Sequence, residues 1–167
     1  MKLTRIWLAA LALPVVAAAQ AAPAKAKTDP KASLAVINAN VEKITNFPEH
    51  ERWNANAAAW RIEVAHLDGL TQTEVSEMRS SLGTMALSLS RIREAGEKER
   101  WQANVDLWHL LLSSNGVLGK EELVKAQALV DKITANLARV DDSAEKERWL
   151  ANRDIWQAVI DRAATIA

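Results

Sequence analysis

The chain has no cysteine and no tyrosine, one phenylalanine, and only four prolines and five glycines among its 167 residues. Without cysteine the fold cannot use disulfides, so its stability must come from packing. Three of the prolines lie before residue 31, and Pro48 is the only one after it. Long segments without proline and with little alternation of β-branched residues favour helices over a sheet.

No charge excess, metal motif or catalytic motif stands out. Lysine and arginine total 21, aspartate and glutamate also total 21, and no basic stripe suggests a nucleic-acid partner. The histidines His50, His66 and His109 form no i, i+4 pair of the kind that binds zinc. No serine lies in a nucleophile elbow, and no glycine-rich phosphate loop is present. We therefore predict no catalytic, cofactor-binding or metal-binding residues, and a protein that is not an enzyme.

The N-terminal segment has the features of a signal peptide. Lys2 and Arg5 precede an apolar run over 6–16, and Ala19-Gln20-Ala21 places small residues where a signal peptidase reads them. The run is shorter than the roughly 20 residues that a membrane span needs, and none like it follows. We predict a signal peptide over 1–21, no membrane span after cleavage, and a periplasmic or secreted protein. The alternative is an N-terminal anchor helix that stays uncleaved.

An internal repeat of 48 residues dominates the rest of the chain. The sequence Glu-Arg-Trp-x-Ala-Asn-x-x-x-Trp occurs three times without a gap, and segments 97–108 and 145–156 agree at nine of twelve positions. All six tryptophans after residue 21 belong to this motif. Its Glu, Arg, Trp, Asn and Trp are Glu51, Arg52, Trp53, Asn56 and Trp60 in the first copy; Glu99, Arg100, Trp101, Asn104 and Trp108 in the second; and Glu147, Arg148, Trp149, Asn152 and Trp156 in the third.

Each motif follows a segment whose apolar residues recur at intervals of three, four and three, which is typical of a helix that packs along one seam. In the first copy these residues are Leu34, Ile37, Val41 and Ile44. The seam starts earlier in the other two copies, so the first unit should have a shorter leading helix. The predicted helices are 31–46, 49–67, 72–95, 97–114, 120–142 and 145–165.

The fold class is therefore all-α: three tandem helical hairpins that form a six-helix bundle or a short α-superhelix. The expected organisation is a signal peptide over 1–21, a flexible tether over 22–31, and one helical domain over 32–167. The three repeats span about 32–70, 71–118 and 119–167. Sequence alone leaves open whether they close into a bundle or stay an open array. Breaks are expected at Pro48, Gly96 and Ala144, just before the motif helices.

On a helical wheel the two tryptophans and the asparagine of a motif share one face, with the arginine at its edge. If this face is structural, the tryptophans are core side chains, the asparagine needs a repeated partner such as a backbone carbonyl, and the arginine stacks on a tryptophan or pairs with a glutamate. If it is functional, the tryptophans line a groove in which Asn and Arg contact a ligand. Repetition in all three units favours the structural interpretation, since every unit must form an interface.

The leading functional hypothesis is an exported, non-enzymatic binding or scaffolding protein of the cell envelope. It would present a rigid helical surface to another envelope or secreted protein. The alternative is a small-ligand protein that binds glycan, peptide or lipid in a Trp-lined groove. Exposure of the tryptophans distinguishes the two.

Overall fold

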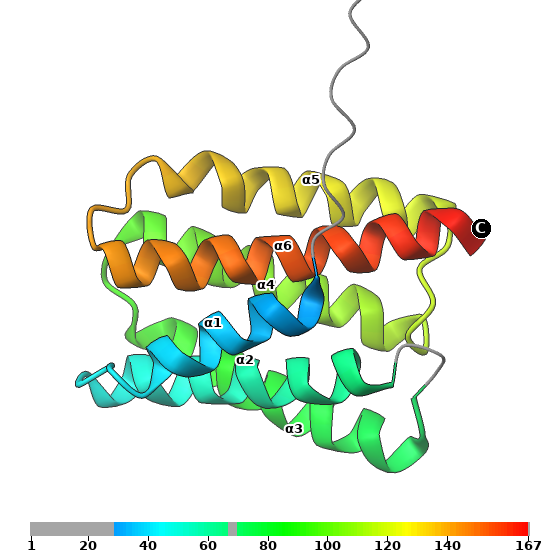
Figure 1. The fold of residues 1–167 in the computed structure, drawn as a ribbon, viewed down its shortest axis with the longest axis horizontal. Helices are drawn as coiled ribbons and strands as arrows, with labels where there is room; N and C mark the ends of the chain where they lie inside the picture. The colour runs from blue at the N-terminus through cyan, green and yellow to red at the C-terminus, as the bar shows by residue number, and fades with distance from the viewer. Residues whose placement is uncertain (1–28, 67–69, 167) are drawn as a thin grey trace, which may run out of the picture.

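A computed structural model describes residues 29–66 and 70–166, and this part of the chain forms α-helices and no strand (Figure 1). The all-α prediction is confirmed. The predicted signal peptide and residues 22–28 of the predicted tether lie outside the described residues. No described helix is both long and apolar enough to cross a membrane. The helices are α1 (Pro30–Val41), α2 (Phe47–Ala65), α3 (Gln72–Ser88), α4 (Ala95–Ser113), α5 (Lys120–Leu137) and α6 (Ser143–Ile166), with a 3-10 turn at Leu89–Arg91.

The helices lie side by side in a bundle, roughly along one direction (Figure 1). The three motif helices α2, α4 and α6 carry most of the core. Each leading helix packs against two motif helices: α3 against α2 and α4, α5 against α4 and α6, and α1 against α6 and α2. The packing of α1 on α6 joins the first described helix to the last.

The leading helices end earlier than predicted, and this is a correction. Ends were expected at 46, 95 and 142, but the α-helices stop at Val41, Ser88 and Leu137. The last seam residue leaves the helix without leaving the core: Ile92 has φ −81° and ψ 123° and is 7% exposed. Apolar periodicity overestimated these helices, because an extended residue can reach the same core as a helical one.

The motif helices begin two residues earlier than predicted. Asn46 accepts a hydrogen bond from the Glu49 N–H at 3.1 Å, and Asp142 accepts one from the Glu145 N–H at 2.6 Å. These side chains satisfy backbone donors of the first turn that have no partner within the helix. The breaks expected at Pro48, Gly96 and Ala144 therefore lie inside first turns.

Candidate functional site

The six motif tryptophans form two layers of three buried indoles. None is more than 1% exposed. Each layer takes one indole from each of α2, α4 and α6, and most pairs meet edge to face, the arrangement that the quadrupole of the ring favours. In the first layer the ring centroids of Trp53, Trp101 and Trp149 lie 4.9, 5.0 and 5.0 Å apart; in the second, those of Trp60, Trp108 and Trp156 lie 4.3, 4.5 and 4.7 Å apart.

The three motif asparagines form a closed ring of hydrogen bonds. Asn104 Nδ2 donates to Asn56 Oδ1 at 3.0 Å, Asn152 Nδ2 to Asn104 Oδ1 at 3.0 Å, and Asn56 Nδ2 to Asn152 Oδ1 at 2.9 Å. Each amide oxygen also accepts an indole N–H of the second tryptophan layer, from Trp108, Trp156 and Trp60 at 3.0, 2.8 and 2.7 Å. A repeated partner was expected, for example a backbone carbonyl. The partner is instead the same residue of another unit.

The motif arginines join one unit to another in the same cyclic way. Their Nη2 atoms donate to glutamates of a different unit, and their guanidinium carbons lie 5.5–5.7 Å from the centroid of a first-layer indole. The pairs are Arg52–Glu97 at 2.6 Å, Arg100–Glu145 at 2.7 Å and Arg148–Glu49 at 2.7 Å.

The sequence predicted that each motif arginine would stack on a tryptophan or pair with a repeated glutamate, and both contacts are present, but it did not identify which glutamates take part. They stand two residues before the motif glutamate, at the same position in all three copies, so their repetition was a usable signal. The motif glutamates have a different role: Glu99 accepts from Asn136 Nδ2 at 3.2 Å, Glu147 accepts from Asn40 Nδ2 at 3.3 Å, and Glu51 lies 3.6 Å from Arg91. These contacts hold the ends of leading helices against motif helices.

The motif arginines are more deeply buried than their place on the helical wheel suggested, so they should contribute more to the stability of the fold. The helical wheel placed Arg100 at the edge of the motif face, but it is only 4% exposed and its Nε has no hydrogen-bond partner. The partner glutamates are less buried. Desolvation raises the pKa of Glu97, with repulsion from Glu145 and Glu49 acting in the same direction and Arg52 acting against it.

Replacing Arg100 with alanine should lower the free energy of unfolding by about 2 kcal/mol. The change removes a buried contact with Trp149 and leaves Glu145 unpaired, but that carboxylate can gain water. Arg91→Ala is the control, because that side chain is 60% exposed and its ion pair spans 3.6 Å; its change should stay below about 0.5 kcal/mol. Equal losses in urea titrations of the two variants would contradict this account.

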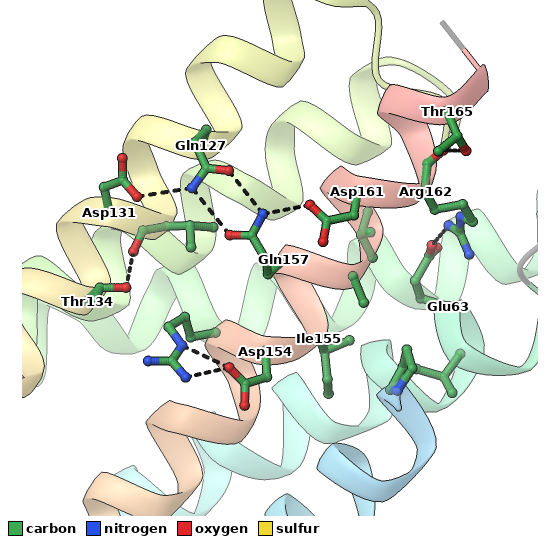
Figure 2. A pocket seen from close by; sticks show the side chains of 16 residues that line it. Glu63, Gln127, Asp131, Thr134, Asp154, Ile155, Gln157, Asp161, Arg162 and Thr165 are labelled. Carbon is green, nitrogen blue, oxygen red and sulfur yellow. Dashed lines mark hydrogen bonds and ion pairs between the residues drawn. The ribbon is translucent and has the colours of Figure 1, made fainter. Parts of the chain in front are cut away.

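A groove of about 830 Å³ lies over α6, between α5 on one side and α1 with the end of α2 on the other (Figure 2). Its apolar part includes Val64, Ile155 and Val159. Its polar part is a row of side chains from α5 and α6, in which Gln127 and Gln157 bond to each other through both amides, at 3.1 and 3.3 Å. Sequence reasoning did not predict this groove.

Glu63 lies at the edge of this groove and is 2% exposed. Positions 48 and 96 residues further along carry Leu111 and Val159, so the first unit has a carboxylate where the others have an apolar core residue. Arg162 Nη2 donates to Glu63 Oε1 at 2.8 Å. Desolvation raises the pKa of Glu63 above its ordinary value of 4.5, against the opposing effect of Arg162.

Replacing Glu63 with leucine should raise the free energy of unfolding at pH 7–8 by about 1–2 kcal/mol. A buried ion pair is often no more stabilising than an apolar pair, and Arg162, 27% exposed, can turn to water. Because the pKa of Glu63 is raised on folding, the folded state holds its proton more tightly, so stability falls as the pH rises from about 4.5 through the folded pKa.

That fall should be smaller in Glu63→Leu than in the parent protein, as thermal unfolding measured from pH 4 to 8 will show. Glu63→Gln is the matched control: it also removes the titration but leaves a buried polar group, so it should gain less stability. A pH dependence identical in all three proteins would disprove the assignment to Glu63.

The tryptophans, asparagines and arginines of the motif are thus brought together in the interior, whereas Glu51 is partly buried and Glu99 and Glu147 are exposed. The described residues form no groove lined by tryptophan, and the groove over α6 is made from other positions. Comparisons with protein-family models, with curated proteins and with solved structures give no match.

Proposed function

We propose that this chain is an exported, non-enzymatic binding or scaffolding protein of the cell envelope that acts through a rigid helical surface. We also propose that its three units are tandem copies of one helical hairpin, closed into a six-helix bundle. The observation that carries the first proposal is that the tryptophans, asparagines and arginines of the motif all lie in the interior. Indoles, amides and guanidinium groups contact each other across units, which leaves the outer surface for recognition.

The closed arrangement is supported by contacts between the first and last units. Arg148 pairs with Glu49, Asn56 donates to Asn152, and α1 packs on α6. An open array would leave such groups at its two ends without these partners. A closed bundle of helices has few ways to deform. The surface that it presents is therefore fixed before a partner binds, which lowers the entropy cost of binding.

The test is capture of partners from an envelope extract with the exported protein as bait, after crosslinking and with mass-spectrometric identification. A specific envelope protein that the free bait competes away would support the proposal. Only non-specific material, equal to that retained by bait unfolded with urea, would count against it.

A small-ligand function remains the alternative, favoured by the groove over α6, whose volume is in the range of ligand pockets, about 300–1,000 Å³. It would not use the motif tryptophans, since all six of them are buried. Metabolite profiling of the purified protein by mass spectrometry tests it, because a bound small molecule should be enriched over a denatured sample.

A further inference from the structure

We propose that a second groove, between α4 and α5, is a docking site for an acidic amphipathic helical segment of a partner protein. The segment would place large aliphatic residues, three or four positions apart, on the floor of the groove, and carboxylates two turns apart along its α5 edge. This inference rests on the proposed function and names the surface and the kind of partner. Three observations carry it: the shape of the groove, its difference from the other two copies, and its charge.

The groove between α4 and α5 has a volume of about 670 Å³ and lies on the outer surface of the bundle. Its lining residues have the same spacing on both helices: 106, 109, 110 and 113 on α4, and 125, 128, 129 and 132 on α5. Each set spans two turns of helix, about 10 Å. Two helices that lie side by side over this length form a groove of the kind that accepts a third, amphipathic helix.

The floor of the groove is apolar and is not fully covered by the protein. Leu110 of α4 and Leu129 of α5 line it, and both side chains are only partly buried. Ala128, which also lines the groove, is exposed. An aliphatic side chain of the occupant would therefore remove apolar surface from water at these residues, which favours binding.

The other two copies of the repeat show that the fold does not require this floor. The positions of Leu110 and Leu129 can be compared in the corresponding seams between a motif helix and a leading helix. They are Ile62 and Ser81 between α2 and α3, and Ala158 and Ser33 between α6 and α1. The bundle therefore forms its other two seams without a second large apolar side chain at this place.

The charge of the groove favours an acidic occupant. Lys125 and Lys132 line it together with one carboxylate, Asp106, so its net charge is +1 with His109 neutral. Asp106 accepts the amide N–H of Gln102 at 2.9 Å. The ion pairs among the described residues include neither lysine. Carboxylates of a partner would thus supply the negative charge that these two ammonium groups lack.

The two lysines also determine the spacing of those carboxylates. Lys125 and Lys132 are seven residues apart, so they stand on one side of α5 about 10.5 Å apart along its axis. Two glutamates seven residues apart on a helical occupant have the same separation. The corresponding positions are Glu77 and Thr84 between α2 and α3, and Asp29 and Val36 between α6 and α1. The basic edge, like the pair of leucines, therefore distinguishes this seam from the other two.

The probe is an acetylated, amidated peptide, AAQLEQALAALEQA in one-letter code, titrated into the exported, ¹⁵N-labelled protein. Its leucines share one face of a helix, and its glutamates lie on the neighbouring face, two turns apart. We expect saturable shifts of backbone amides confined to 106–113 and 125–132. The same peptide with lysine in place of both glutamates should bind about tenfold more weakly or not at all, since two partly exposed ion pairs supply about 1.4 kcal/mol.

Variants of the protein separate the contribution of charge from that of apolar contact. Lys125→Gln together with Lys132→Gln should weaken binding of the acidic peptide about tenfold, with an unchanged melting temperature, because both side chains are exposed. Leu129→Ser should abolish binding and keep the fold, since both other copies carry serine at this position. In the control Ser81→Leu, the seam between α2 and α3 gains a leucine beside Glu77 and should still not bind the acidic peptide.

Shifts outside the two segments, equal binding of the two peptides, or undiminished binding by Leu129→Ser would overturn the proposal. So would shifts of the same amides that appear with protein concentration alone, which indicate a second copy of this chain. Shifts that appear with phosphatidylglycerol vesicles but not with the peptide would overturn it as well, because they indicate a lipid surface.

These outcomes are separable from those of the proposed function. If the envelope partner is captured equally well by Leu129→Ser, by Lys125→Gln/Lys132→Gln and by the parent protein, the groove between α4 and α5 is refuted and the binding function stands. If no specific partner is captured while the acidic peptide still binds the groove, the proposed function fails and the chemistry of the groove stands.

Discussion

Replacing Trp101 with alanine should lower the free energy of unfolding by about 3–5 kcal/mol, among the largest effects of any single substitution in this chain. The indole is 1% exposed, meets two other indoles at 4.9 and 5.0 Å, and lies under the guanidinium of Arg52. Alanine would leave a cavity that three helices can close only by moving together. Denaturant titration monitored by circular dichroism measures the loss.

The same change at Trp149 should cost a similar amount, because its ring has the same neighbours one unit further on. Phe47→Ala is the control: this aromatic residue lies in a motif helix but is 71% exposed, and its loss should stay within about 0.5 kcal/mol. If both tryptophan variants unfold at the same denaturant concentration as the parent protein, the indoles cannot be core residues.

Much of this core could be predicted from the repeat. A helical wheel places Asn104 about 60° from Trp101 and 40° from Trp108, which draws the amide and both indoles to one interface. The structure places all three side chains in the interior. The three-residue spacing of Thr71 and Glu74 likewise predicts a capping box, and both of its backbone hydrogen bonds are formed. Such features depend on residues within one or two turns of each other.

The contacts between units could not be predicted in this way. A wheel describes one helix, so it placed Arg100 at an edge without showing that Glu145 of another unit covers it. The ion pair between Arg148 of the third unit and Glu49 of the first depends on the angles between helices, which local periodicity does not encode. The groove over α6 could not be predicted for a related reason: its residues differ from copy to copy, whereas a repeat pattern identifies only the positions that the copies share. One local signal of the groove is present: the first copy carries Glu63 at the position where the other copies carry Leu111 and Val159.

Replacing Asn104 with alanine should lower the free energy of unfolding by about 2–4 kcal/mol, although the side chain is small. The substitution removes the acceptor of two buried donors, the Asn152 amide and the Trp156 indole N–H, and the donor to Asn56. Each buried donor left without a partner costs about 1–3 kcal/mol. Asn54→Ala in α2 is the control, since that amide is only partly buried, and its effect should be below about 0.5 kcal/mol.

The ring of asparagine hydrogen bonds also predicts that the effects of substituting two of its asparagines do not add up. Asn56→Ala alone leaves the Asn104 amide and the Trp108 indole without their oxygen acceptor, whereas Asn56→Ala together with Asn104→Ala removes one of those donors as well. The double variant should therefore lose less stability than the two single losses added, by about 1 kcal/mol, as expected for residues that share a hydrogen bond. Strictly additive losses would mean that the amides act separately. An unchanged unfolding midpoint for Asn104→Ala would contradict the ring itself and make the asparagines candidates for ligand contacts.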